Sequence, residues 1–168
     1  MSGGRDGLLG PERTQAGAVA SGWTVLQYAA FYLGLTNLIA GSLGLLAPLV
    51  LGNEDQIVNI NPGKFLGISG INLPHGLIHA GLGLAGVLAS RAHRLSLRYM
   101  EASALAWALL TVMYLVAHRG SGEGNHMVMG LAIDNGATTV HIVWTGLTLL
   151  LAAHPVFRRG GAIRPPAD

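Results

Sequence analysis

Long apolar runs alternate with shorter polar segments along most of the chain. Four of these runs are long enough to cross a bilayer, and they extend over about residues 23–51, 74–90, 99–117 and 137–157. A helix needs roughly 17 to 25 apolar residues to span a hydrocarbon core of about 30 Å. The pattern therefore predicts an all-α integral membrane protein that folds as a four-helix bundle.

The first run is longer than a perpendicular crossing requires. We expect its helix to tilt, or its last turn beyond Ala47 and Pro48 to emerge from the bilayer, because proline interrupts helical hydrogen bonding. The second run is the shortest of the four and is rich in glycine.

The composition supports a membrane class. Of the 168 residues, 51% are hydrophobic and only 11% are charged, whereas soluble domains carry about a quarter charged residues. The chain has no cysteine, which excludes disulfides, iron–sulfur clusters, thiolate zinc sites and covalent haem attachment. Any metal or cofactor would therefore need histidine, carboxylate, amide or backbone ligands.

Basic residues lie almost entirely in segments that a four-span topology places on one side. Positively charged short loops stay in the cytoplasm, whereas acidic residues contribute little to orientation. We therefore expect both termini to be cytoplasmic, in a bacterial cytoplasmic membrane or a membrane derived from it. The basic residues of that side are Arg5, Arg13, Arg91, Arg94, Arg98, Arg158, Arg159 and Arg164, while the opposite loops contain only Lys64 and Arg119.

The chain is expected to divide into an arm, one membrane domain and a tail. Residues 1–22 lack a basic leader followed by an apolar core, which predicts a disordered cytoplasmic arm rather than a cleaved signal peptide. Residues 23–157 are predicted to form a single transmembrane domain, because four helices joined by short loops leave no second core to bury. Residues 158–168 would form a basic cytoplasmic tail.

The second and fourth runs each begin with a helix-capping signal. Pro74 favours the first helical turn, where its missing N–H has no partner to lose, and Asn72 or Leu73 would be the cap. Asp134 and Asn135 precede the fourth run in the corresponding way. Asn72 and Asp134 each stand seven positions before a histidine, which hints at an internal repeat of two helical hairpins.

These two histidines fall at one depth when both helices enter from the same face. At about 1.5 Å per residue, His79 and His141 each lie roughly 8 Å below the start of their helix. His75 precedes His79 by one turn, and both share a helix face with Gly83 and Gly86. Imidazole facing lipid would have no partners, so we expect this stripe to face the bundle interior.

The spacing His75-x-x-x-His79-x-x-x-Gly83-x-x-Gly86, followed by His141 at the start of the last run, resembles a known family. It is similar to the bacterial four-helix membrane proteins called domain of unknown function 4383. The resemblance covers roughly residues 25–155. It implies a four-span bundle, and it implies no established activity.

The residues leave three roles open for His75, His79 and His141. Neutral rings could bond to each other or to nearby polar groups and so join the helices, with no cofactor, which is the first expectation. Imidazoles from the second and fourth helices could instead be axial ligands of a haem or chlorin. A divalent metal held by His75 and His79 is the third alternative, with His141, or His126 and Asp134, as further ligands. The polar partners within reach would be the side chains of Asn37, Tyr114, Thr138 and Thr145, or a backbone carbonyl.

The sequence lacks the usual signatures of an enzyme. It has no nucleophile with an adjacent base, no paired carboxylates and no dinucleotide fingerprint, so we expect no enzymatic activity. The few basic residues follow the topology, which argues against nucleic-acid binding. We expect a small accessory or scaffold subunit that packs beside other membrane proteins or copies of itself, with Trp107 and Trp144 serving in packing. The alternative is a histidine-ligated haem, chlorin or metal protein that serves electron transfer or light capture.

Overall fold

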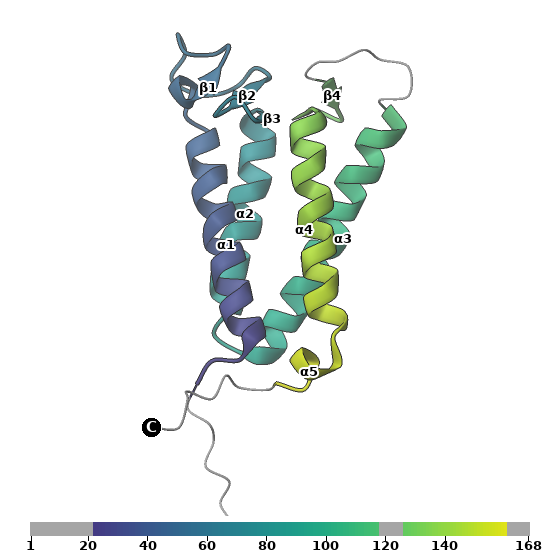
Figure 1. The fold of residues 1–168 in the computed structure, drawn as a ribbon. Helices are drawn as coiled ribbons and strands as arrows, with labels where there is room; N and C mark the ends of the chain where they lie inside the picture. The colour runs from purple at the N-terminus through teal and green to yellow at the C-terminus, as the bar shows by residue number, and fades with distance from the viewer. Residues whose placement is uncertain (1–21, 118–125, 161–168) are drawn as a thin grey trace, which may run out of the picture.

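The computed structural model of the protein describes residues 22–117 and 126–160. Two helical hairpins, α1 with α2 and α3 with α4, stand side by side (Figure 1). Almost all of the predicted arm at 1–22 and most of the predicted tail at 158–168 lie outside the described residues. The helices are α1 Val25–Gly44, α2 Leu73–Ala89, α3 His93–Ala117, α4 Asn135–Ala153 and the short α5 Pro155–Arg158.

Three of the helices begin at a side chain that caps them. Thr24 caps α1. Asn72 caps α2 by accepting from the His75 N–H at 3.4 Å, and Asp134 caps α4 by accepting from the Ala137 N–H at 2.8 Å. These caps satisfy backbone donors that have no partner within the helix. The second and fourth apolar runs thus become helices that begin beside the residues singled out in the sequence.

The first apolar run is longer than the helix that it forms. α1 ends at Gly44, and the chain continues through a 3-10 turn at Ala47–Leu49 into strand β1 at Val50–Leu51. Pro48 lies in that turn, where it replaces helical hydrogen bonding with a change of direction. The end of the run therefore leaves the bundle.

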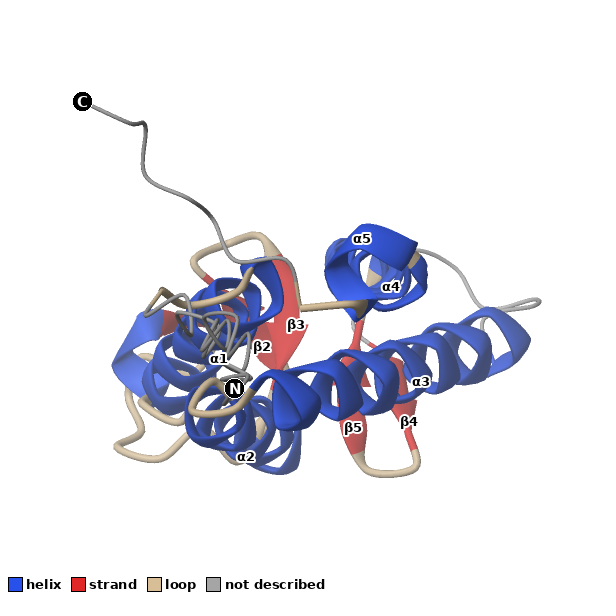
Figure 2. Cartoon of the chain, turned by 90° about the horizontal axis from the view of Figure 1, so that it is seen from below, coloured by secondary structure: helices blue, strands red, loops and turns tan. Residues whose placement is uncertain are grey.

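Two small antiparallel sheets cover the end of the bundle at which α2 and α4 begin (Figures 1 and 2). The sequence pattern predicted loops where the other four strands lie, and it placed the residues of β1 at the end of the first apolar run. Each strand has two or three residues, which is too short to give a recognisable alternation of polar and apolar positions. We call this end of the molecule the strand end. Besides β1, the strands are β2 Gly63–Phe65, β3 Ser69–Ile71, β4 His126–Val128 and β5 Leu131–Ile133.

Asn72 joins the two hairpins at the strand end. Its Nδ2 donates to the Gly130 carbonyl oxygen at 2.9 Å, and its Oδ1 accepts from the Ala132 N–H at 3.1 Å. Lys64 of the first sheet also pairs with Asp134, at 4.0 Å, at the start of α4. The starts of α2 and α4 are therefore held at a common level.

Glycines bring α1 and α2 into close contact. A Cβ atom added to Gly83 would collide with the backbone of Leu38, and one added to Gly34 would lie 2.6 Å from the backbone nitrogen of Val87. Gly83 and Gly86 are buried. The glycine end of the predicted stripe thus faces the bundle interior, and helix backbones approach each other as small residues allow.

α3 connects the two hairpins by packing on α1, α2 and α4. Trp107 and Tyr114 lie in one apolar core, which extends to β5 near the strand end. Leu26 and Met100 lie in a second core near the opposite end. The space between the first sheet and the three histidines described below lies outside these two cores.

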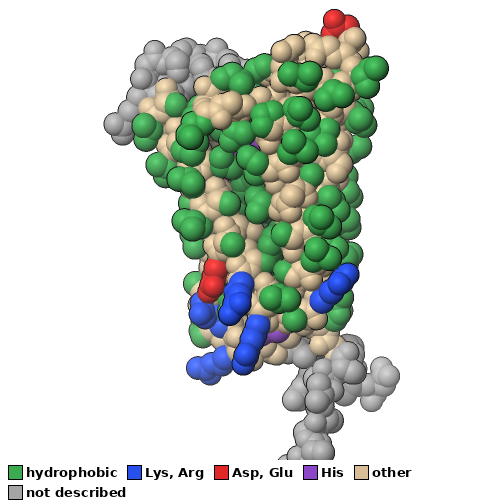
Figure 3. All heavy atoms as spheres, turned by 180° about the vertical axis from the view of Figure 1, so that it is seen from behind, with side chains coloured by type: hydrophobic (Ala, Val, Ile, Leu, Met, Phe, Trp, Pro, Cys, Tyr) green, Lys and Arg blue, Asp and Glu red, His purple; other side chains and the backbone are tan. Residues whose placement is uncertain are grey.

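The outer faces of the helices are apolar. Among the described helices, α3 and α4 are long and apolar enough to cross a membrane, whereas the apolar α2 has 17 residues. Leu105 is 71% exposed and Val116 is 66% exposed on α3. Hydrophobic side chains cover the sides of the molecule, and basic side chains gather at one end (Figure 3). The protein is thus predominantly helical, with two helices of membrane-spanning character.

Candidate functional site

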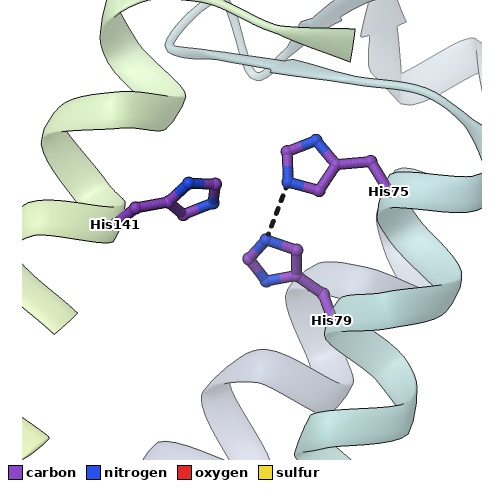
Figure 4. Close-up of side chains that lie close together, drawn as sticks. All are labelled: His75, His79 and His141. Atoms are coloured by element: carbon purple, nitrogen blue, oxygen red, sulfur yellow. Dashed lines mark hydrogen bonds between the residues drawn. The ribbon is translucent and has the colours of Figure 1, made fainter. Parts of the chain in front are cut away.

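Three histidine side chains from two helices converge inside the strand end of the bundle (Figure 4). His75 and His79 project from α2, and His141 projects from α4 toward them. The ring centroids of His75 and His79 are 4.9 Å apart, and His141 lies 5.5 and 5.9 Å from them. One nitrogen of each ring lies within 4.8 Å of the other two. We call these residues the histidine triad.

Equal spacing from the helix caps explains why the rings meet. His79 and His141 each lie seven residues after their capping residue, Asn72 or Asp134. His75 and His141 are each 1% exposed, and His79 is partly buried. All three rings face the interior of the bundle, as the sequence predicted.

Hydrogen bonds fix which nitrogen carries the proton in two of the rings. Nδ1 of His75 lies 2.7 Å from the carbonyl oxygen of Ala132, which can only accept, so the Nδ1–H donates. Nδ1 of His79 lies 2.9 Å from Oδ1 of Asn37. The Asn37 amide is itself oriented, because its Nδ2 donates to the Leu33 carbonyl oxygen at 2.9 Å. Both neutral rings therefore donate through Nδ1 and carry a lone pair on Nε2.

The two lone pairs point at each other. Nε2 of His75 and Nε2 of His79 are 3.2 Å apart (Figure 4), and two acceptors at this distance attract only when a cation lies between them. Nδ1 of His141 is buried and has no hydrogen-bond partner within the described ranges. An unpaired buried polar atom costs about 1–3 kcal/mol. The triad therefore contains ring nitrogens that have lone pairs available for a metal ion, and the protons of the three rings do not pair all of these nitrogens.

Trp107 of α3 forms the wall behind the triad. Its ring stacks on His141 with centroids 5.0 Å apart and an interplanar angle of 22°, and it lies 4.8 Å from the ring of His79. Sequence reasoning assigned Trp107 to packing alone and missed this position. The position depends on how α3 packs against the α1–α2 hairpin as well as against α4, and no local pattern signals that packing.

Other ligands and partners considered from the sequence lie apart from the triad. Asp134 caps α4 and pairs with Lys64, and the side chain of His126 lies outside the described residues. Of the four predicted polar partners, only Asn37 bonds to a ring of the triad in the described part of the chain. Thr138, Thr145 and Tyr114 donate instead to the Asp134 carbonyl, the His141 carbonyl and Oδ1 of Asn135.

Comparison with known families places this site in a wider group. The family described as Domain of unknown function (DUF4383) matches residues 27–154. The chain belongs to this family. The resemblance seen in the spacing of His75, His79 and His141 is thereby confirmed, and the DUF4383 match covers the whole triad. No curated protein and no solved structure matches the chain.

A pocket adjoins the triad in this DUF4383 protein. Its volume is about 230 Å³, and it lies between α1 and α4 beneath the segment that joins β2 and β3. His75 and His79 line it, together with Ala40 of α1 and Val140 and Trp144 of α4. The triad therefore has a packed side, formed by Trp107, and an open side, formed by this pocket.

Proposed function

We propose that the protein is a four-helix integral membrane protein that binds one divalent transition-metal ion, of the zinc class, through His75, His79 and His141. The observation that carries this proposal is the 3.2 Å contact between two Nε2 atoms whose rings both donate through Nδ1. An ion between α2 and α4 would accept both lone pairs and a nitrogen of His141. Metal binding would thereby remove the repulsion between the two Nε2 lone pairs that face each other in the neutral rings.

The donor set favours zinc and its neighbours. Imidazole suits zinc, copper, nickel and iron, and three histidines plus one further ligand form a known open zinc site. Two nitrogens bound tetrahedrally at about 2.0–2.1 Å from zinc lie about 3.3 Å from each other, close to the 3.2 Å between the Nε2 atoms. Metal-bound histidines commonly donate their other N–H to a carbonyl oxygen, as His75 and His79 do.

Several features support the membrane topology. At about 1.5 Å per residue, even the 17-residue α2 is about 26 Å long, near the thickness of a bilayer core. Exposed apolar side chains cover the helices, for example Tyr32 and Ile39 on α1. The described arginines, at positions 91, 94, 98, 158 and 159, all lie near the end opposite the strands. This charge asymmetry supports cytoplasmic termini and a triad near the outer face.

The geometry of the triad fits the other roles expected from the sequence less well than it fits a metal ion. A haem or chlorin bound by two axial imidazoles needs a macrocycle between the rings, but the His75 and His79 rings are in contact and Trp107 packs on His79 and His141. Hydrogen bonds from His75 to Ala132 and from His79 to Asn37 already join α2 to β5 and α1, but they leave the two facing Nε2 atoms without a proton between them. An accessory or scaffold role stays a prediction, and it is compatible with a bound ion.

Metal binding is tested on untagged protein purified in mild detergent, so that no polyhistidine tag contributes ligands. The protein is stripped with a chelator and titrated with Co²⁺, whose visible bands report tetrahedral nitrogen ligation, and bound Zn²⁺ is counted by mass spectrometry. We expect one ion per chain. His141→Phe keeps an aromatic ring against Trp107 but removes a ligand, and it should weaken binding at least about 100-fold.

The matched control is His154→Ala, which removes an exposed histidine beyond α4 and should leave both stoichiometry and affinity unchanged. Thermal unfolding of the metal-free proteins, followed by circular dichroism, shows that His141→Phe is folded. Its melting temperature should rise, because the variant no longer buries an unpaired nitrogen. Substoichiometric metal in the wild type, or equal affinity in wild type and His141→Phe, would overturn the proposal.

A further inference from the structure

The pocket beside the triad suits an uncharged, apolar group. Apolar side chains dominate its lining, and none of the lining residues is charged. The hydroxyl of Thr36 donates to the Tyr32 carbonyl oxygen, and both polar atoms of the Asn37 amide are engaged within the protein. A charged or strongly polar molecule would lose its hydration there and could find partners only at Ser69 and at the rings of His75 and His79.

The size of the pocket limits what it accepts. An apolar cavity of about 150 Å³ takes one benzene ring, and this pocket measures about 230 Å³. A single ring with one or two additional heavy atoms therefore fits, whereas a long acyl chain does not fit entirely. The pocket lies between α1 and α4, whose outer faces carry exposed apolar side chains, and the hydrocarbon layer would surround these faces in the proposed topology.

A metal ion bound by the triad would require a fourth ligand that compensates its charge. Three neutral imidazoles leave a divalent ion with two uncompensated positive charges inside an apolar bundle, and no carboxylate belongs to the triad. A buried charge is strongly disfavoured unless it is paired. Trp107 closes one side of the triad, so the fourth ligand comes from the pocket, and an anionic donor stabilises the ion more than a neutral one.

We propose that the pocket binds a small, membrane-soluble ring compound carrying one acidic oxygen or sulfur, which becomes the fourth ligand of the metal. This inference rests on the proposed function. On binding, the S–H or O–H bond of the ligand breaks, its proton passes to solvent, and the remaining lone pair forms the bond to the metal. The ring fills the space between Ala40 and Val140.

Two thiols of similar acidity provide the test. Co²⁺-loaded protein is titrated with benzyl mercaptan, which carries a ring, and with 2-mercaptoethanol, which does not. A sulfur-to-cobalt charge-transfer band in the near ultraviolet reports coordination. We expect benzyl mercaptan to bind about 30-fold more tightly, because its ring leaves water for the apolar pocket.

Two variants fill the pocket from opposite walls, Ala40→Phe and Val140→Phe, and both leave the triad intact. Each should retain one Co²⁺ per chain and lose the preference for benzyl mercaptan at least tenfold. Ala85→Phe, on an exposed position of α2, is the matched control and should behave as the wild type. If metal binds but the two thiols bind alike, or both filling variants keep the preference, the pocket inference is wrong while the metal site stands. If no Co²⁺ binds, the proposed function itself fails.

Discussion

Asn37 is the residue on which the protonation of the triad depends. Its Nδ2 donates to the Leu33 carbonyl oxygen one turn back in α1, which turns Oδ1 toward His79. Without this acceptor, His79 could carry its proton on Nε2 and donate to His75. The ring would then hydrogen-bond well and bind metal poorly, because the proton occupies the nitrogen that faces the ion.

Replacing Asn37 tests this argument. We expect Asn37→Leu to weaken Zn²⁺ binding about 10- to 100-fold, the usual effect of losing an outer hydrogen bond to a metal ligand. Competition with a chromophoric chelator measures the change. Thr36→Val is the control, since that hydroxyl bonds only to its own helix backbone, and it should shift the affinity little. Equal affinities for wild type and Asn37→Leu would contradict the assigned role of the amide.

At the scale of elements, the α1–α2 hairpin depends on positions without side chains. Gly83 lies against the Leu38 backbone, and Gly34 lies against the turn of α2 that contains Gly86. Lipid tails are as apolar as leucine, so helices in a bilayer associate by close packing rather than by the hydrophobic effect. This contact sets how near His79 lies to Asn37, because the two residues come from the same pair of helices.

Two glycine substitutions in α2 separate packing from helix propensity. Gly83→Ala places a methyl group where the Leu38 backbone lies and should destabilise the protein by about 1–3 kcal/mol. Nothing lies within 4 Å of a Cβ at Gly81, so Gly81→Ala should stabilise the helix by up to about 1 kcal/mol. Chemical denaturation in detergent measures both. A similar effect of the two substitutions would show that the helix contact is not close.

The helices were largely predictable from the sequence, and the strands were not. Each apolar run corresponds to one long helix, although α3 begins at His93, before its run, and the short α5 overlaps the end of the fourth run. The caps of α2 and α4 follow from Asn72 and Asp134. The end of α1 at Gly44 was not predictable, because residues 45–51 are as apolar as the helix before them and periodicity does not separate a short apolar turn from a helix. The short strands are held by pairing with distant segments, which a local pattern does not reveal.

At the scale of the whole molecule, the proposed membrane topology predicts that the arginine-rich end lies in the cytoplasm. The natural chain has no cysteine, so single cysteines can be introduced without a background. In cells, a membrane-impermeant maleimide should label Asp55→Cys at the strand end from outside. It should label Ala92→Cys, in the α2–α3 turn, only after the cells are permeabilised.

Leu109→Cys serves as the control for burial in lipid, because Leu109 lies on an exposed, apolar face of α3. A polar reagent should not label it in either condition. Labelling of Ala92→Cys in intact cells together with protection of Asp55→Cys would reverse the orientation and place the triad near the cytoplasm.

The site itself was predicted only in part. The positions of His75, His79 and His141 follow from helical spacing and from equal distances to the caps, which are local features. The carbonyl of Ala132 that orients His75 is a backbone group, which any residue type would supply, so no side chain marks it. Trp107 reaches the triad because α3 packs on α1 and α2 as well as on α4, and that arrangement belongs to tertiary structure.

Asn72 and His75 both hydrogen-bond to the backbone of one residue of the opposite hairpin, Ala132. Asn72 accepts from the N–H of Ala132, and His75 donates to its carbonyl oxygen. A protein that grips β5 from outside the membrane would therefore move an imidazole in the bundle interior and alter how fast the ion leaves. By thermodynamic reciprocity, loading the ion would stiffen that strand and change its affinity for such a protein. Whether the triad holds its ion inside the bilayer would thus change how the exterior surface binds another protein.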